Sequence, residues 1–338
     1  MILVTGGTGL VGSHLLFKLA QKNENVRAIH RAGSDIKYVK RIFSFYTKNP
    51  KPLFDKIEWF EADINDLPKL KIGFEGIKLV YHCAAFISFD SSNYKTLRTI
   101  NIQGTSNIVN LCIENKIKKL CYVSSVATMG YSDEVINEET NWQGSKNKSV
   151  YAISKYGAEL EVWRGIQEGV SSVIVNPGVI IGPGFWNSGS GNLFKMVYKG
   201  QRHYTNGVTG FVDVYDVTAA MIKLMKSKIK NQRYILVAEN LYYKKLIYLI
   251  AKHLRVSHPN KLASKFILNI TLIFDYLVSK LLMKERRLSK ELIRTIVRSN
   301  NYSSDKIINS LEEFKFNPID KSIKKVCKIF FMESPSVK

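Results

Sequence analysis

Only four of the 338 residues are cysteines, and none has a second cysteine or a histidine at the spacing of a metal site or a redox motif. A disulfide framework and a structural zinc site are therefore not expected, and we expect no metal. The four thiols are predicted to be small buried hydrophobic side chains: Cys83, Cys112, Cys121 and Cys327.

Acidic residues are also scarce, because 28 Asp and Glu stand against 50 Lys and Arg and give a formal net charge of +22. A field of this size attracts nucleic acids and anionic membranes. The lysines are spread along a chain that is generally rich in Lys, Ile and Asn, however, so we expect no nucleic-acid partner. The densest basic clusters are predicted to be solvated ends or faces of helices: Lys116–Lys119, Lys223–Lys230 and Lys284–Arg287.

Long uninterrupted apolar runs are missing. The sequence passes from Met1 directly into an apolar strand pattern, so we expect no signal or transit peptide and a cytoplasmic protein. The most apolar helix candidate, residues 267–283, contains Asp275 and is flanked by Lys265 and Lys280, which makes it too short and too interrupted to span a membrane. It is predicted to be either a buried helix or one lying at a membrane surface, which leaves peripheral membrane contact open.

What the sequence does contain is a regular alternation of strand and helix patterns. Such alternation is typical of a parallel sheet with crossover helices, and the predicted fold class is α/β with a doubly wound parallel sheet. After Pro177 the regularity fades, although residues 211–214 predict a strand and residues 217–226 a helix that Asp216 could cap. The other expected strands are 2–4, 26–29, 57–61, 79–82, 120–123 and 172–175, and the long helices are 93–115 and 150–167.

A glycine-rich turn follows the first expected strand, with the spacing Gly-x-x-Gly-x-x-Gly. At a strand-to-helix junction, such a turn lets a dinucleotide pyrophosphate approach bare backbone and the positive end of the helix dipole. A Cβ at Gly6 or Gly9 would obstruct that approach. The residues expected to border the pyrophosphate are Gly6, Thr8, Gly9, Leu10, Val11 and Gly12.

Several downstream motifs accompany the turn in a specific order. They are His82-Cys-Ala-Ala85, Ser124-Ser125-Val-Ala-Thr-Met-Gly130, Tyr151-Ala-Ile-Ser-Lys155, Asn176-Pro-Gly178 and Gly210-Phe-Val-Asp-Val-Tyr-Asp216. With them the chain resembles an extended short-chain dehydrogenase/reductase of the NAD-dependent epimerase/dehydratase superfamily. The resemblance covers most of the chain. It implies a Rossmann-type domain over 1–176, to which 209–232 returns, and a smaller, mostly helical C-terminal substrate lobe made of 177–208 and 233–338.

The resemblance also implies catalytic residues. Tyr151 is expected to be the acid/base, and Lys155, one helical turn further on, would favour its phenolate and bond the nicotinamide ribose. Ser125 would hold the substrate oxygen and stabilise developing negative charge. Asn101 would complete a proton relay, although a plain capping or bridging role for this asparagine stays open.

Cofactor choice should depend on the end of the second strand, where an acidic residue would accept from a ribose hydroxyl. Here Arg31 stands in that place and can pair with a 2′-phosphate, so NADP(H) is preferred. NAD(H) stays open, because Arg31 could instead stack on the adenine or Asp35 could reach the ribose. By resemblance, further cofactor contacts come from Asp63, Ile64, Ala84, Ala85, Ser124, Tyr151, Lys155 and Pro177; a turn or cap role for Asp63 stays open.

The reaction is harder to predict, because one Ser-Tyr-Lys set serves reductases, epimerases and dehydratases alike. Sugar-nucleotide members commonly carry an Arg-Asp pair where this chain has Gly210-Phe211, although Arg202 or Lys199 could substitute for that arginine. Segments 26–31 and 33–35 are similar to dihydroflavonol-reductase-like and 3β-hydroxysteroid-dehydrogenase-like members. We therefore favour reversible carbonyl/alcohol redox on a small hydrophobic substrate. The aromatic residues that suit it, or that simply form core, are Phe185, Trp186, Phe194, Tyr204 and Phe211.

Two alternatives remain at this stage, namely a nucleotide-sugar epimerase or dehydratase and a non-catalytic cofactor-sensing or scaffold protein. We expect a homodimer, because relatives commonly dimerise through the two long helices 93–115 and 150–167.

Overall fold

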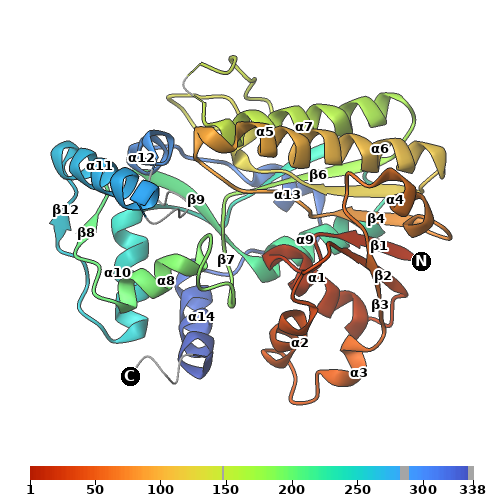
Figure 1. The fold of residues 1–338 in the computed structure, drawn as a ribbon, viewed down its shortest axis with the longest axis horizontal. Coiled ribbons are helices and arrows are strands. Elements are labelled where there is room, and N and C mark those ends of the chain that lie inside the picture. The colour runs from red at the N-terminus through yellow and green to blue at the C-terminus, as the bar shows by residue number, and fades with distance from the viewer. Residues whose placement is uncertain (147, 282–288, 334–338) are drawn as a thin grey trace.

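The computed structural model describes residues 1–146, 148–281 and 289–333 and contains a parallel sheet of seven strands. The strand order is β10-β6-β5-β4-β1-β2-β3. Later strands are added outward on both sides of β1, which makes the sheet doubly wound. The predicted Rossmann-type α/β fold is confirmed (Figure 1). The strands are β1 (Ile2–Thr5), β2 (Val26–His30), β3 (Ile57–Glu61), β4 (Leu79–His82), β5 (Lys119–Val123), β6 (Ser172–Pro177) and β10 (Gln232–Leu236).

Helices cover both faces of this sheet because its strands are apolar on both sides. In β1, Val4 packs into the cluster that contains Leu15 of α1, whereas Leu3 packs into the opposite cluster with Ile108 of α6 and Val162 of α7. The helices flanking the sheet are α1 (Leu10–Gln21), α2 (Ile36–Ser44), α3 (Lys51–Phe54), α4 (Leu67–Gly73), α6 (Gly104–Glu114), α7 (Val150–Gln167), α9 (Val214–Lys226) and α13 (Asp305–Ser310).

The second lobe contains two small sheets and a cluster of helices (Figure 1). One sheet has the order β11-β9-β7, from β7 (Val179–Ile181), β9 (Val208–Asp213) and β11 (Glu239–Tyr242); the other pairs β8 (His203–Tyr204) with β12 (Lys261–Leu262). Its core lies where α8, α10 and α14 meet around Phe194 and Phe211. The helices are α8 (Gly191–Tyr198), α10 (Tyr243–Leu254), α11 (Lys265–Leu281), α12 (Lys290–Val297) and α14 (Ile319–Glu333).

The helix predicted over 93–115 is present without a break in the helical backbone, but its hydrogen-bond pattern changes along its length. A 3-10 turn (η1, Ser91–Asn93) and a short helix (α5, Tyr94–Leu97) lead into a π-helical segment (η2, Arg98–Gln103), and α6 follows it. The sequence prediction considered only the α-helical period, so it did not reveal the π segment.

The expected cap of the later helix is also corrected. Helix α9 begins at Val214, and Asp213 caps it by accepting a hydrogen bond from the Tyr215 amide at 2.8 Å. Asp216 lies inside the first turn and binds Asn317 instead.

One predicted basic cluster is corrected, because Lys119 is buried in β5 rather than solvated. Its Nζ donates to the carbonyls of Leu224 at 2.5 Å and Ser227 at 3.0 Å, at the C-terminal end of α9. The negative end of the helix dipole favours a cation there. The cluster Lys284–Arg287, and the end of the predicted helix at 282–283, lie outside the described residues.

The apolar helix candidate corresponds to α11, and within residues 1–146, 148–281 and 289–333 no helix is long and apolar enough to cross a membrane. Three of the four cysteines are buried as predicted, and Cys83 is half-buried.

Candidate active site

The glycine-rich turn joins β1 to α1 in a conformation that only glycine tolerates. Gly6 has φ of +68°, and a Cβ there would lie 2.6 Å from the Ala84 nitrogen. A Cβ on Gly12 would lie 2.2 Å from the Gly6 oxygen. Gly9 is the N-cap of α1, and no side chain caps this helix, so the first backbone N–H groups are open toward the turn. This cradle fits the pyrophosphate of a dinucleotide.

The other predicted turn residues follow directly. Thr8, Leu10 and Val11 are half-buried around the exposed Gly9, and the turn is closed by a hydrogen bond of 3.0 Å from the Gly9 amide to the Gly6 carbonyl. All six residues predicted to border the pyrophosphate therefore lie together at the carboxyl end of β1.

Arg31 is exposed immediately after β2, at the same edge of the sheet as the turn. Asp35 is also exposed there and caps α2, with its Oδ1 accepting from the Tyr38 amide at 3.0 Å. The Oδ1 of Asp63 accepts from the Asn65 amide at 2.8 Å, which is a turn contact. Arg31 is therefore an exposed cation at this edge, and one oxygen of Asp35 is held by its cap.

The remaining residues of the predicted cofactor path differ in burial. Ile64 is 6% exposed and packs on Gly104, whereas Ala84 is half-buried, bonds through its amide to Thr5 and lies over the turn. Ala85 is exposed, and Pro177 is buried as the last residue of β6.

Ser125, Tyr151 and Lys155 converge at the carboxyl end of β5. Ser125 is the N-cap of the 3-10 helix η3 (Val126–Thr128), with its Oγ accepting from the Ala127 amide at 3.1 Å. Tyr151 and Lys155 occupy successive turns of α7, which begins at the Ser149 cap. The Ser125 side chain lies close enough to the Tyr151 phenol to lower its pKa, which opposes the effect of burial.

The charges in this group differ from the sequence-based expectation. Burial raises the pKa of Tyr151 to about 12, opposed by the Ser125 side chain. Burial also lowers the pKa of Lys155 to about 7, opposed by the charge of Glu159. The Lys155 ammonium donates to the Tyr122 phenol at 2.7 Å and to the Val123 carbonyl at 2.8 Å, so it faces these groups rather than stabilising a Tyr151 phenolate.

Asn101 lies in the π-helical segment η2 and is 1% exposed. Its Oδ1 accepts from the Phe86 amide at 2.7 Å, and its Nδ2 donates to the Phe86 carbonyl and the Ser154 hydroxyl, each at 2.9 Å. Asn101 thus holds the loop after β4 against α7. The π segment turns this side chain inward, and π segments are frequent at functional sites.

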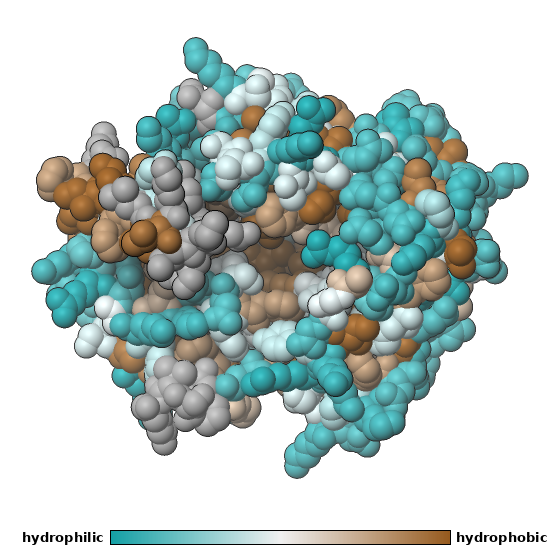
Figure 2. All heavy atoms as spheres, in the orientation of Figure 1, coloured by the Kyte–Doolittle hydropathy of each residue, from teal (hydrophilic) through white to brown (hydrophobic). Residues whose placement is uncertain are grey.

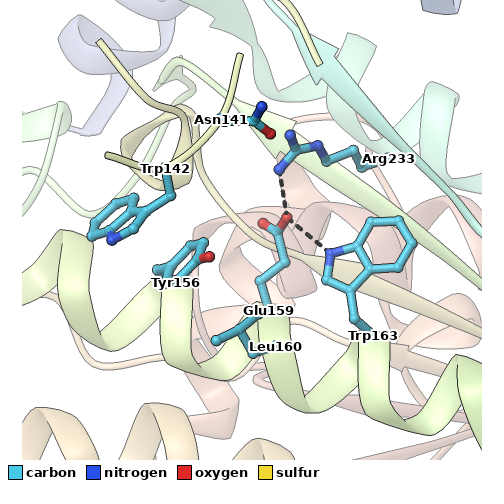
Figure 3. A pocket seen from close by; sticks show the side chains of 7 residues that line it. All are labelled: Asn141, Trp142, Tyr156, Glu159, Leu160, Trp163 and Arg233. Carbon is cyan, nitrogen blue, oxygen red and sulfur yellow. Dashed lines mark hydrogen bonds and ion pairs between the residues drawn. The ribbon is translucent and has the colours of Figure 1, made fainter. Parts of the chain in front are cut away.

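Sequence reasoning missed Glu159, which is 1% exposed on α7 one turn beyond Lys155. Its Oε2 accepts from Ser124 at 2.5 Å, Thr128 at 2.9 Å and Asn176 at 2.8 Å. Figure 3 shows the other oxygen facing Arg233 and Trp163, which donate to it at 3.3 and 3.4 Å. The signal was present in the sequence, because Tyr151, Lys155 and Glu159 recur every four residues along one helix.

A cavity of about 260 Å³ lies on the other side of Glu159, between α7 and Arg233 (Figure 3). Trp142 and Tyr156 stack in it with ring centroids 4.3 Å apart. Neither Ser125, Tyr151 nor Lys155 lines this cavity, so it is separate from the convergent group.

Two of the aromatic residues expected near the substrate are core residues. Phe194 and Phe211 are both 0% exposed within the hydrophobic cluster of the second lobe. Trp186 is half-buried and packs on Phe330 of α14, with its Nε1 bonded to Glu333 at 2.7 Å. Phe185 and Tyr204 are half-buried. The aromatic content of this lobe therefore reflects packing more than a lined pocket.

Comparisons with known proteins agree with this geometry. Residues 2–237 match the NAD-dependent epimerase/dehydratase family. A Synechocystis protein assigned as a dihydroflavonol 4-reductase is 31% identical over 70% of this chain and 68% of its own length, and cinnamoyl-CoA reductase 1 of Petunia hybrida is 25% identical over 75% and 77%. Among solved structures, gox2253 superposes with a TM-score of 0.81 at 23% identity over 99% and 98% of the two chains. A UDP-glucose 4-epimerase from Thermotoga maritima gives 0.76 at 18% over 98% and 99%.

Proposed function

The chain belongs to the NAD-dependent epimerase/dehydratase family, and from this premise we propose that it is an NADP(H)-dependent oxidoreductase that interconverts a carbonyl and an alcohol on a small hydrophobic substrate. The observation that carries the proposal is that Ser125, Tyr151 and the buried Lys155 converge at the carboxyl end of β5. The glycine turn supports it, because its cradle fits a dinucleotide pyrophosphate.

When bound, the nicotinamide cofactor supplies the hydride in reduction or accepts it in oxidation. Tyr151 is then the proton donor to the substrate oxygen, and its high pKa keeps the phenol protonated at neutral pH. Ser125 donates to the same oxygen and stabilises the charge that develops on it. Lys155, whose pKa burial lowers to about 7, would bond the nicotinamide ribose. Asn101 fixes the loop after β4, whose Phe89 ring centroid lies 5.6 Å from that of the Tyr151 ring.

NADP(H) is preferred to NAD(H) because Arg31 is exposed at the end of β2 and Asp35 is committed to capping α2. A guanidinium pairs with a phosphate through charge-assisted hydrogen bonds, whereas the nearest described carboxylate, Asp35, already has one oxygen bonded in its cap.

A hydrophobic substrate is favoured over a nucleotide sugar because Gly210-Phe211 stands where sugar-nucleotide relatives carry an Arg-Asp pair, and Phe211 is buried in the lobe core. The names of the relatives, dihydroflavonol 4-reductase and cinnamoyl-CoA reductase, support carbonyl reduction. The solved epimerase with UDP-glucose, which superposes over the whole chain, supports the second candidate, a nucleotide-sugar epimerase.

The two candidates are separated by denaturing the freshly purified protein and identifying any released dinucleotide. An empty protein that then binds NADPH better than NADH supports a reductase whose cofactor exchanges. About one tightly held NAD per chain supports the epimerase, since a cofactor recycled within one turnover need not leave, and it overturns the reductase proposal.

We retain two further predictions as part of this proposal. The first is the division of the chain into a Rossmann domain and a substrate lobe. The segment expected to return to the Rossmann domain, 209–232, ends at Gln232, where β10 begins. The second is a homodimer formed through α6 and α7, which light scattering on the purified protein would test.

A further inference from the structure

Helix α11 has its apolar side turned outward. Six large hydrophobic side chains on it are exposed. Tyr276 (46%) lies to one side, and the other five form a stripe: Phe266 (73%), Ile270 (51%), Ile273 (59%), Phe274 (67%) and Leu281 (83%). Their spacing of 4, 7, 8 and 15 residues from the first places all five on one side of the helix. An ordinary surface helix turns such a stripe toward the core, so this exposed stripe marks an interaction surface.

The opposite side of α11 attaches it to the protein. Among the side chains of α11 that the structure describes, only Leu272 and Ser279 are buried. Asp275 also lies on that side by helical spacing, away from the apolar stripe. The stripe consists of the five residues above, and Lys280 shares their side of the helix by the same spacing.

The surroundings of the stripe are basic. No aspartate or glutamate occurs between Glu239 and Asp275 in the sequence. Exposed Lys261 lies in β12, directly before α11, and its amide bonds the carbonyl of exposed Arg202 at 3.1 Å. Strand β8, which pairs with β12, carries Tyr204. The Nζ of exposed Lys244 lies 4.9 Å from the centroid of the Tyr204 ring. Figure 2 shows hydrophobic atoms gathered over α11 at the left, with hydrophilic atoms over β8 and β12 directly below.

We propose that this apolar stripe and its basic border dock the protein on an anionic lipid surface. The described part of α11, 17 residues or about 25 Å, is too short to cross a bilayer but sufficient to lie in the headgroup region with its apolar side inserted. The border of Arg202, Lys244 and Lys261 supplies the charge complementarity that selects anionic lipid as the partner.

Docking through α11 would also place the candidate active site beside the membrane. The next helix, α12, contacts the start of α7, because Glu291 accepts from the Val150 amide at 3.3 Å, one residue before Tyr151. The face shown in Figure 2 is hollowed between the two lobes, with hydrophobic atoms at the bottom of the hollow. A hydrophobic substrate could then pass from lipid to this hollow without crossing bulk water.

Vesicle flotation of the full chain tests the proposal without any activity assay. The protein should float with vesicles made of equal parts phosphatidylcholine and phosphatidylglycerol, and much less with phosphatidylcholine alone. Phe274→Glu should lower the bound fraction at least about tenfold, because it puts a charge in the apolar contact. Lys261→Glu should weaken binding at low salt, and added salt should reduce this difference.

Ile72→Glu is the matched control, because Ile72 is 53% exposed on α4, at the other end of the molecule from α11 (Figure 1). Ile270→Ser is a milder change in the stripe should Phe274→Glu fail to fold, which its melting temperature would reveal. A wild-type protein that does not bind anionic vesicles overturns the proposal, as does equal loss of binding in Ile72→Glu. Loss of a dimer in Phe274→Glu without vesicle binding by the wild type would show that a second copy covers the stripe, and it too overturns the proposal.

Discussion

The hydroxyl of Ser124 donates a hydrogen bond of 2.5 Å to Oε2 of Glu159, on the side of the carboxylate that faces the catalytic loop. The Thr128 hydroxyl lies 2.9 Å from the same oxygen and 2.8 Å from the Ser125 carbonyl, and its one proton is shared between these two acceptors. One buried carboxylate therefore ties the loop that carries Ser125 to the helix that carries Tyr151. The spacing between these two groups depends on a residue that touches neither of them.

Glu159→Gln should change the pH dependence of turnover. Burial lowers the pKa of Lys155 to about 7, and the Glu159 charge opposes that shift. Removing the charge lowers the pKa further, by about one pH unit. Lys155 then loses its proton at a lower pH, so the basic limb of the kcat/KM profile should move to lower pH by the same amount.

Glu161→Gln, two residues away on α7, is the control because Glu161 pairs with Arg164 at the surface. Its profile should match that of the wild type. A Glu159→Gln enzyme with reduced kcat but an unshifted profile would mean that Glu159 only supports the fold.

Tyr151→Phe should lower kcat by about 10²- to 10⁴-fold, because it removes the proton donor to the substrate oxygen. Cofactor affinity, measured by fluorescence titration, should change little. Tyr156→Phe is the matched variant on the other side of α7, where the ring stacks on Trp142. Turnover that survives in Tyr151→Phe would refute the proposed mechanism.

Arg31→Ala should weaken NADPH binding about tenfold to hundredfold and leave NADH binding nearly unchanged, since it deletes a charge-assisted contact to the 2′-phosphate alone. Lys56→Ala is the control, because this exposed cation lies before β3 and so at the opposite edge of the sheet. If the ratio of kcat/KM for NADPH over NADH is below one in the wild type, or does not move in Arg31→Ala, the preference for NADP(H) is wrong.

Gly9→Ala and Gly12→Ala should distinguish a loss of dinucleotide binding from a loss of fold stability. A Cβ on Gly9 would meet only the Gly6 oxygen at 3.4 Å, an ordinary contact, whereas one on Gly12 would lie 2.2 Å from that oxygen. Gly9→Ala is expected to keep its melting temperature and lose most dinucleotide affinity, because the added methyl group occupies the open side of the turn. Gly12→Ala is expected to lose both. Full cofactor affinity in Gly9→Ala would show that the pyrophosphate does not approach there.

The sequence predicted the strands of the main sheet within one or two residues because each is an apolar run bounded by turn residues, as in Leu79–His82. The seventh strand, β10, was not recognised, since Gln232–Leu236 begins with polar residues that face outward at the sheet edge. Asp213 and Asp216 were equally good caps by residue type, and only the end of β9 decides between them.

The candidate site was predictable in its parts but not in its connections. Gly6, Ser125, Tyr151 and Lys155 follow from local motifs that place them at the carboxyl ends of strands or on one helix. The partners of Lys155 come from a different strand, where Tyr122 and Val123 lie, and no pattern within α7 indicates them. Buried polar contacts between segments distant in sequence depend on the packed structure, which periodicity does not describe.

His14 should make the free energy of unfolding fall as the pH drops below about 6.5. The ring is fully buried on α1, where it bonds Tyr46 and its Nε2 donates to the Pro183 carbonyl at 3.2 Å, and burial lowers its pKa to about 4. In the unfolded chain His14 binds a proton below its ordinary pKa of about 6.5, whereas in the folded chain it binds one only below about 4. The contribution of neutral His14 to stability is therefore complete above pH 6.5 and is lost as the pH falls from about 6.5 to about 4. Between pH 7 and pH 5 the loss from His14 is about 2 kcal/mol. Urea unfolding at both pH values should show that His14→Gln reduces the difference by this amount, whatever its effect at pH 7, while the exposed His258→Gln leaves the difference unchanged. An equal pH dependence in His14→Gln and the wild type would mean that His14 is protonated in the folded protein and that another group, such as buried His82, causes the acid sensitivity.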